Sequence, residues 1–394
     1  MITVSINNMA VYCCVLFASS TLLQGFPALD ALNRVFIILI LFVIAIGIFL
    51  NKMKASSFFM ILLAIVLTLI SALHYVGVGL INNIMYLGFW VLFFEYMGNH
   101  YDGFIKSLRE NIDIVHIFVL LWTMLVIASF FYPGAYRSKW GGEYFRSFAT
   151  GAHRMASVCP TILAAAVLLA RLKNKKRFLL YLLLPIILIL ISGARTYLGV
   201  AFLFAICLYY SYCPNKRMFY YTVLPVTIIM ITVVYFSPMW DKMMYTTTTI
   251  GAHGDTEQFL RRFTSGRTYV WVATFEYFFN LSLWRQIVGD GADATIRVIY
   301  SAFGQEFFAH NDFINILVCN GCLGIIAYLS SFLSFTRFAF RRTNTPLLVK
   351  TGILSMWFFN AMFNQAYTYP AFVLAMPLLL YALTIRYRVS DSEP

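Results

Sequence analysis

The chain has 394 residues, of which 61% are hydrophobic and only 11% are charged, and its formal net charge is +13. So small a charged fraction excludes a soluble fold, and the many long apolar runs predict an all-α polytopic membrane protein. The excess of Lys and Arg fits a basic cytoplasmic face and does not indicate nucleic-acid binding.

We predict about twelve transmembrane helices in a single domain that covers residues 1–394. The apolar runs lie near residues 9–25, 33–50, 57–73, 79–97, 114–132, 155–170, 178–192, 196–212, 218–236, 312–336, 351–365 and 369–385. Most Lys and Arg residues near the ends of these runs fall on one side if both termini are cytoplasmic, which predicts that orientation. No cleavable signal is evident, so we expect the first run to remain as a span.

A tight membrane hairpin is predicted at Ser192-Gly193-Ala194-Arg195-Thr196. The stretch from Arg177 to Lys216 is only long enough for two crossings of about 20 residues each, so Arg195 must lie at or below the far interface. An unpaired guanidinium at that depth costs at least ~2.5 kcal/mol, which favours a bound ligand or a carboxylate partner. The alternative is a membrane anchor whose charged group reaches the interface.

The predicted external loop over residues 133–154 breaks the positive-inside pattern. Against the single acid Glu143 it carries four basic residues, Arg137, Lys139, Arg146 and Arg154. A basic loop on the outer face indicates either an anionic ligand or attraction to lipid head groups.

A second external loop, over residues 237–309, is long and rich in aromatic residues, which argues against disorder. We expect it to fold onto the membrane bundle. Within it, the pattern from Arg267 to Phe279 predicts one helix with an apolar, interfacial face.

Ionisable residues gather where this loop returns to the membrane, at Glu306, His310 and Asp312. If the segment is helical, Glu306 and His310 are four residues apart on one face, and the carboxylate can orient the imidazole. A histidine at the membrane surface suits general-base chemistry near neutral pH. The alternatives are an interfacial histidine and, for Asp312, a helix N-cap.

Signatures of soluble enzymes are absent from the sequence. It contains no P-loop, no GxGxxG after a strand, no HExxH and no GxSxG. Gly289-Asp290-Gly291 is too short for a phosphate loop and predicts a turn. The pair Cys319 and Cys322 has the spacing of half a zinc site, but no second pair completes it, so we predict no metal site.

Several of these segments together resemble the bacterial O-antigen polymerase and O-antigen ligase superfamily, which are membrane glycosyltransferases of the GT-C type. The resemblance rests on Ser192-Gly193-Ala194-Arg195, Gly266-Arg267, Trp271, Gly289-Asp290-Gly291, His310-Asn311-Asp312-Phe313 and Gly321-Cys322-Leu323-Gly324. It implies that Arg195 and Arg267 hold the diphosphate of a polyprenyl-linked glycan and that His310 is catalytic. Glu306 and Asp312, which lie close to His310 in the sequence, are further catalytic candidates.

Two guanidiniums can stabilise a leaving diphosphate by bidentate hydrogen bonds, so we expect neither a metal nor another cofactor. Arg146 and Arg154 of the basic loop are further candidates for diphosphate binding. The expected function is polymerisation of undecaprenyl-diphosphate-linked oligosaccharide repeat units at the outer face of a bacterial cytoplasmic membrane. A ligase with a lipid A core acceptor and a transporter of the same lipid are the alternatives. Expected partners are the lipid-linked oligosaccharide, membrane lipid, a chain-length regulator and a flippase, but no nucleic acid.

Overall fold

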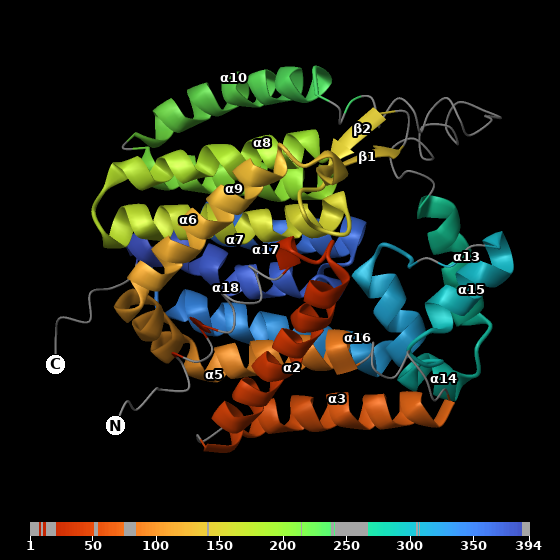
Figure 1. Cartoon of the computed structure of the whole chain (residues 1–394). Coiled ribbons are helices and arrows are strands. Elements are labelled where there is room, and N and C mark those ends of the chain that lie inside the picture. The colour runs from red at the N-terminus through yellow and green to blue at the C-terminus, as the bar shows by residue number, and fades with distance from the viewer. Residues whose placement is uncertain are drawn as a thin grey trace.

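The computed structural model describes residues 8, 11–12, 21–50, 54–74, 84–139, 142–213, 215–237, 240, 267–304, 306 and 308–387. Within these ranges the chain is almost entirely helical, and most of its long helices run side by side along one direction (Figure 1). Of the twelve predicted spans, the one at 9–25 falls mostly outside the described residues.

The first half of the chain forms a helical bundle interrupted by one β-hairpin. Its elements are α2 (Pro27–Leu50), α3 (Ala55–His74), the π-helix η1 (Ile84–Gly88), α5 (Phe89–Glu110), α6 (Ile112–Ser129), η2 (Pro133–Ala135), β1 (Tyr136–Lys139), β2 (Gly142–Phe145), α7 (Ala152–Leu172), η3 (Lys176–Leu182), α8 (Leu183–Ile191), α9 (Arg195–Tyr212) and α10 (Lys216–Tyr235). The predicted span 178–192 is thus not one regular helix, because its first part is 3₁₀-helical.

The second half completes the bundle and adds a group of short helices at one end. Its elements are α13 (Arg267–Phe279), α14 (Leu283–Val288), α15 (Ala294–Phe303), α16 (Asp312–Arg341), α17 (Leu347–Asn364), η4 (Ala366–Thr368), α18 (Pro370–Thr384) and η5 (Ile385–Tyr387). Helices α13, α14 and α15 gather at the right-hand end of the bundle in Figure 1.

Five helices in the described ranges are long and apolar enough to cross a membrane. They cover residues Ile112–Ser129, Ala152–Leu172, Lys216–Tyr235, Asp312–Arg341 and Pro370–Tyr387. This confirms the coarse prediction of a helical protein with membrane-spanning segments.

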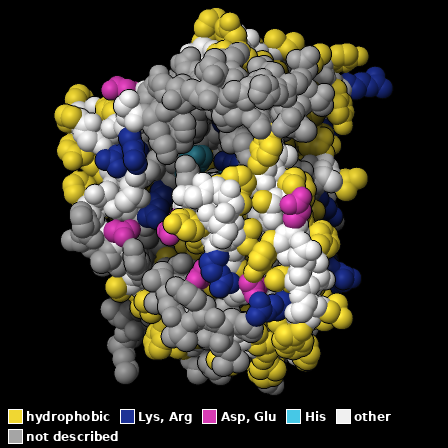
Figure 2. Space-filling view, turned by 90° about the vertical axis from the view of Figure 1, so that its right-hand side faces the viewer, with side chains coloured by type: hydrophobic (Ala, Val, Ile, Leu, Met, Phe, Trp, Pro, Cys, Tyr) yellow, Lys and Arg dark blue, Asp and Glu magenta, His cyan; other side chains and the backbone are white. Residues whose placement is uncertain are grey.

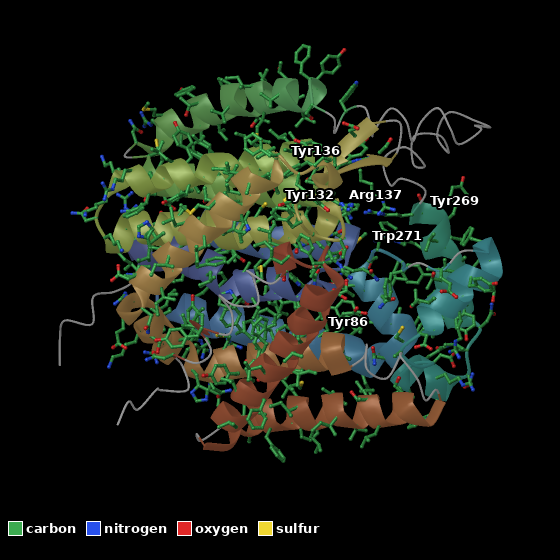
Figure 3. The ribbon with its side chains drawn as sticks, in the orientation of Figure 1. Tyr86, Tyr132, Tyr136, Arg137, Tyr269 and Trp271 are labelled. Carbon is green, nitrogen blue, oxygen red and sulfur yellow. The ribbon has the colours of Figure 1, made fainter. Side chains whose placement is uncertain are left out.

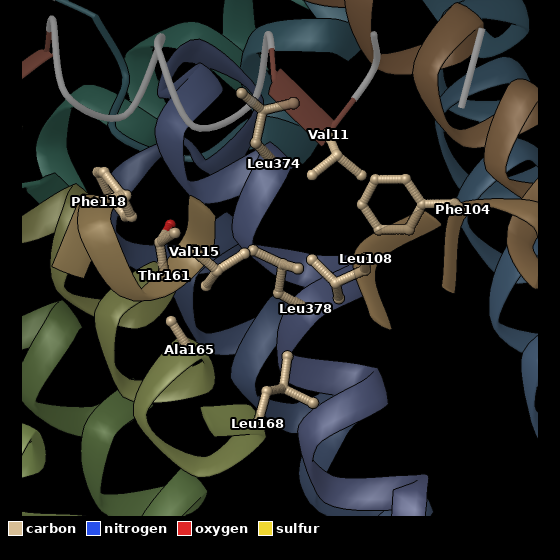
Figure 4. Close-up of a pocket in the computed structure, with 10 residues that line it drawn as sticks. All are labelled: Val11, Phe104, Leu108, Val115, Phe118, Thr161, Ala165, Leu168, Leu374 and Leu378. Carbon is tan, nitrogen blue, oxygen red and sulfur yellow. The ribbon is translucent and has the colours of Figure 1, made fainter. Parts of the chain in front are cut away.

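The centre of the bundle is formed by α7 and α18, which pack along each other. The side chains of Ala164, Ala165 and Ala166 on α7 are buried, and small residues at such a position let two helix backbones approach closely. Helix α16 packs along α5, and α17 packs along α9. A pocket between α5, α6, α7 and α18 is lined by apolar side chains and Thr161, and at about 20 Å³ it has room for about one water molecule (Figure 4).

The basic loop folds into an antiparallel hairpin in which Arg137 on β1 pairs with Tyr144 on β2. The sequence did not predict these strands. The backbone N–H of Arg146 donates to the carbonyl of Ala135 at 2.8 Å, which closes the base of the hairpin beside the first turn of α7.

Helix α13 has the bounds that the sequence predicted, Arg267–Phe279. Its buried face, which includes Val270 and Phe278, packs toward α15 and α16. Helices α14 and α15 also contact α16, so this group of three helices is fixed to a long helix of the bundle.

Helix α16 is broken at Gly321, where φ is +66°. The turn Gly289–Gly291 packs into this break: the N–H of Asp290 donates to the carbonyl of Val318 at 2.9 Å, and the N–H of Gly291 donates to that of Cys319 at 3.2 Å. The predicted turn is confirmed, and it supplies hydrogen bonds to carbonyl groups just before the break.

Candidate functional site

Arg195 lies at the turn between α8 and α9, as the sequence predicted. Helix α8 ends at Ile191, Gly193 has a φ of +63° that glycine adopts without strain, and α9 begins at Arg195 itself. Ser192 and Ala194 are fully buried, so the tip of the hairpin is enclosed by protein. Arg195 is only partly exposed and interacts electrostatically with Tyr144 of the β-hairpin.

Arg267 begins α13 and lies near Arg195, although the two are far apart in the sequence. Its Nη1 donates to the carbonyl oxygen of Phe363 near the end of α17. Burial, followed by repulsion from Arg195, lowers the pKa of Arg267 to about 10, against the opposite effect of Tyr369. Arg267 therefore stays protonated at neutral pH. Two neighbouring cations, Arg195 and Arg267, favour an anion between or beside them.

A cavity of about 250 Å³ lies against the β-hairpin and the start of α7. Its wall carries four basic or potentially basic side chains and two tyrosines, namely Arg137, Arg146, His153, Arg154, Tyr144 and Tyr369. Those tyrosines are the residues that interact with Arg195 and Arg267. Of the four predicted arginines, Arg146 and Arg154 line this cavity, together with Arg137. Arg195 and Arg267 are not among its described lining residues, but each interacts with one of its tyrosines.

Arg146 and Arg154 differ in their contacts within this wall. Arg146 donates from Nε to the carbonyl of Gly134 at 3.0 Å and from Nη1 to that of Thr150 at 3.3 Å, so it also holds the loop around the hairpin. Arg154 donates from Nη1 to Oε1 of Gln24 at 3.0 Å and lies 3.5 Å from Oδ1 of Asp30.

A second cavity, of about 200 Å³, adjoins the first. Arg154 and Tyr369 line both cavities, and the second also contains His310, Asp30, Gln24 and Ser157 in its wall. Viewed from this end, the surface shows a hollow in which a histidine and a Lys or Arg side chain are visible (Figure 2). The basic cavity and the cavity that contains His310 therefore meet at two shared residues, Arg154 and Tyr369.

His310 lies in the segment just before α16, with a φ of +52°. Few non-glycine residues adopt this left-handed conformation, and such residues occur often at functional sites. The preceding residue is fixed from α13, because the indole Nε1 of Trp271 donates to the carbonyl of Ala309 at 2.7 Å. Trp271 lies at the same end of the bundle as Arg137 (Figure 3).

The helical relation predicted between Glu306 and His310 is wrong. Helix α16 begins only at Asp312, and neither Glu306 nor His310 is helical. Glu306 is exposed and is not among the described residues that line either cavity. The reason is that the N-terminal end of the helix is set by Asn311, whose side chain accepts from the N–H of Ile314 at 3.1 Å.

Asp312 is not the N-cap that the sequence offered as one alternative, because Asn311 takes that position. The Asp312 side chain is fully buried, and its Oδ2 accepts hydrogen bonds from the hydroxyl of Tyr328 and from the N–H of Tyr367 at 3.2 Å. Asp312 therefore ties the first turn of α16 to η4 and does not line either cavity among the described residues.

Sequence reasoning missed Asp30, Gln24 and Tyr369. Asp30 is the one acid in the largely apolar helix α2, and it lies in the first turn, which is a signal that could have identified it. Gln24 and Tyr369 lack such a signal, because their positions in the cavities depend on packing between distant segments. No protein-family model matches the chain, and no curated protein matches it at a significant level.

Proposed function

We propose that this protein is a membrane glycosyltransferase that polymerises oligosaccharide repeat units carried on undecaprenyl diphosphate. The observation that carries the proposal is the junction of the two cavities at Arg154 and Tyr369, with clustered arginines on one side and His310 on the other. A diphosphate donor and a hydroxyl acceptor need such a pair of adjoining environments.

In the proposed reaction the donor diphosphate lies by the basic cavity. Arg195 and Arg267 stabilise the negative charge that develops on it, with Arg146 and Arg154 contributing from the cavity wall. The guanidiniums are already in place before the reaction, so this stabilisation needs little reorganisation. Neither a metal nor another cofactor is part of this proposal.

The acceptor hydroxyl lies in the second cavity, beside His310. Its oxygen forms a bond to the anomeric carbon of the donor sugar while the bond from that carbon to the diphosphate oxygen breaks. The hydroxyl proton passes to the neutral imidazole, and the carrier diphosphate leaves. Asp312 acts only as a positioning residue, through Tyr328 and Tyr367.

The proposal includes about twelve spans, cytoplasmic termini and an active site on the outer face of a bacterial cytoplasmic membrane. It includes a chain-length regulator and a flippase as working partners, since polymer length and lipid delivery lie outside the chemistry of the site. The excess of basic residues near the predicted inner ends of the spans supports this orientation.

The test is reconstitution of the purified protein with undecaprenyl-diphosphate-linked repeat units in detergent that contains EDTA. Products with two or more repeat units on the carrier support a polymerase. Glycan that moves only to added lipid A core indicates the ligase. Movement of intact lipid across a vesicle membrane without any new glycosidic bond indicates the transporter and overturns the glycosyltransferase proposal.

A further inference from the structure

A polar groove lies among helices α13, α14 and α15, apart from the two cavities described above. Its volume is about 720 Å³, and three helices and the Gly289–Gly291 turn surround it. The polar and charged side chains in its wall are Glu276, Tyr277, Asn280, Arg285, Asp290, Arg297 and Ser301. On this face of the molecule, acidic and basic side chains lie next to one another (Figure 2).

The two arginines of the groove are held by one buried carboxylate. Arg285 Nη1 lies 2.9 Å from Oδ1 of Asp290, and Arg297 Nη2 lies 3.1 Å from Oδ2. Asp290 is 6% exposed, whereas the side chains of Arg285 and Arg297 are 46% and 47% exposed. Each guanidinium has five N–H donors, so the ion pair fixes its position and leaves other donors for a ligand.

Tyr277 completes this network by donating its hydroxyl hydrogen to Asp290. Burial, and next the hydrogen bond to Asp290, raises the pKa of Tyr277 to about 12, so it remains a neutral hydroxyl at neutral pH. Because Asp290 is also part of the turn that packs into the break of α16, the groove is anchored to the bundle.

The groove differs from the catalytic cavities in its electrostatics. Arg285 and Arg297 are balanced by Asp290 and Glu276, so the wall has no net formal charge but offers both donors and acceptors. Sugar hydroxyls both donate and accept hydrogen bonds. A planar side chain such as that of Arg, Asn or Glu can hydrogen-bond to two neighbouring hydroxyls at once. A diphosphate, in contrast, would favour the cationic cavity.

Helix α13 connects the groove to the proposed catalytic site. Arg267 is its first residue, whereas Glu276 and Tyr277 lie near its other end. Ten residues of α-helix span about 15 Å, a separation that a short oligosaccharide can bridge. We propose that this groove binds the uncharged part of the oligosaccharide chain, so that the glycan extends along α13 while its linkage to the carrier lies by Arg267. The inference rests on the proposed function and names the part of the protein that holds the sugars.

The test measures glycan binding separately from catalysis. The probe is the lipid-free oligosaccharide released by mild acid from the cell's own undecaprenyl-diphosphate-linked saccharide and freed of phosphate. Its binding to the purified full-length protein is measured by saturation-transfer NMR and calorimetry. Ser301 lies in the groove wall and is exposed, so Ser301→Trp places an indole in the groove and blocks part of it without disturbing the core.

We expect Ser301→Trp to weaken glycan binding at least about tenfold, and Asn280→Ala to weaken it less. Tyr300→Trp is the matched control, because Tyr300 is exposed on the same helix but is not among the described residues that line the groove. Unchanged binding in Ser301→Trp, or no binding to the wild-type protein, overturns the proposal. Glycan binding that persists in an inactive Arg195→Ala protein supports the groove as the glycan site. If the wild-type protein binds glycan through the groove but forms no polymer, that result contradicts only the proposed reaction.

The same variant distinguishes the two sources of the sugar chain. A slower first coupling between two single repeat units assigns the groove to the incoming unit, whereas shorter polymers after a normal first coupling assign it to the growing chain. Normal rates and normal chain lengths in Ser301→Trp overturn the proposal.

Discussion

The indole nitrogen of Trp271 donates a hydrogen bond of 2.7 Å to the carbonyl oxygen of Ala309, the residue before His310. Trp271 is one turn after Arg267 on α13, so the same helix face carries the arginine and the contact that fixes the histidine segment. The spacing between the proposed diphosphate site and the proposed base therefore depends on how α13 is placed.

Trp271→Phe should lower turnover roughly 10- to 100-fold, because even a small displacement of His310 misaligns the imidazole with the acceptor hydroxyl. It should lower the free energy of unfolding by only about 1 kcal/mol, the net value of one hydrogen bond. The measurements are polymerisation rate and thermal unfolding in detergent. Trp284→Phe is the control, since Trp284 is 58% exposed and lies on α14. A normal turnover number in Trp271→Phe would show that this contact does not position His310.

Replacement of either central arginine should abolish polymer formation without loss of the protein from the membrane. Arg195→Ala and Arg267→Ala are each expected to reduce turnover at least about 10²-fold, because each removes a donor to the leaving group. Lysine should restore little activity, since an ammonium cannot make the bidentate contact with phosphate. Because the pKa of Arg267 is about 10, donor binding should persist from pH 6 to about pH 9 and decline only as the pH rises through 10.

The check is donor binding and polymer yield at equal protein abundance, with Arg337→Ala as the control on the exposed side of α16. Full activity in Arg195→Ala would reassign Arg195 to membrane anchoring. Full activity in Arg195→Lys would remove the bidentate mechanism but keep a role for the charge.

Local patterns predicted the elements that depend on neighbouring residues. The helix Arg267–Phe279 and the turn at residues 192–196 follow from apolar periodicity and from the length of the apolar run, and both are present. The break of α16 at Gly321 was not predicted, because it depends on the Gly289–Gly291 turn of another segment. The contacts of Arg154 with Gln24 and Asp30 were also missed, since they join residues far apart in the sequence.

The candidate site was predicted only in part, because local sequence patterns reveal some of its residues and contacts between distant segments determine the others. A buried cation in an apolar run is visible in the sequence, so Arg195 was found. The conformation of residues 308–311 was not predicted, because the helix is capped by Asn311 and the segment is held by a tertiary hydrogen bond from Trp271 to Ala309. The positive φ of His310 also has no signal in the sequence. Helical spacing alone therefore gave the wrong relation between Glu306 and His310.

His310→Ala should lower turnover by about 10²- to 10⁴-fold while donor binding changes little. Only a neutral imidazole accepts a proton, so wild-type activity should fall as the pH is lowered and the imidazole becomes protonated. The assay is polymerisation across pH in the presence of EDTA. His116→Ala is the control, since His116 contacts Phe178 within the bundle and is not among the described residues that line either cavity.

Two results would contradict this role of His310. A variant with normal turnover but weak donor binding would assign the histidine to binding. Complete loss of wild-type activity in EDTA, restored by a divalent ion, would contradict the metal-free mechanism.

The orientation in the membrane can be tested by cysteine labelling in intact cells with a reagent that does not cross the membrane. A cysteine at position 306 should react from outside, and one at position 175 should react only after the membrane is opened, because Lys175 belongs to the basic group expected to be cytoplasmic. Both positions are exposed in the structure. The seven native cysteines set the background and are measured in the unmodified protein. Labelling of position 306 only from the cytoplasmic side would overturn an external active site.

Gly304 provides a comparison for testing the break of α16 at Gly321, because both glycines have a positive φ, +65° and +66°. Their ψ values differ, with 17° at Gly304 and −169° at Gly321. A Cβ at Gly321 would lie 2.3 Å from the carbonyl oxygen of Ile287, whereas a Cβ at Gly304 would meet no atom within 4 Å. Alanine strains the backbone by about 1–2 kcal/mol at Gly304 and by more at Gly321, because the conformation of Gly321 is essentially restricted to glycine. Only at Gly321 must the turn before Asp290 also move. We expect Gly321→Ala to lower the free energy of unfolding by about 3 kcal/mol or more and to weaken glycan binding in the groove, while Gly304→Ala costs about 1 kcal/mol and leaves binding unchanged. Thermal unfolding in detergent and binding of the released oligosaccharide measure both effects, and equal melting temperatures for the two variants would show that the turn can leave the break of α16 at no cost.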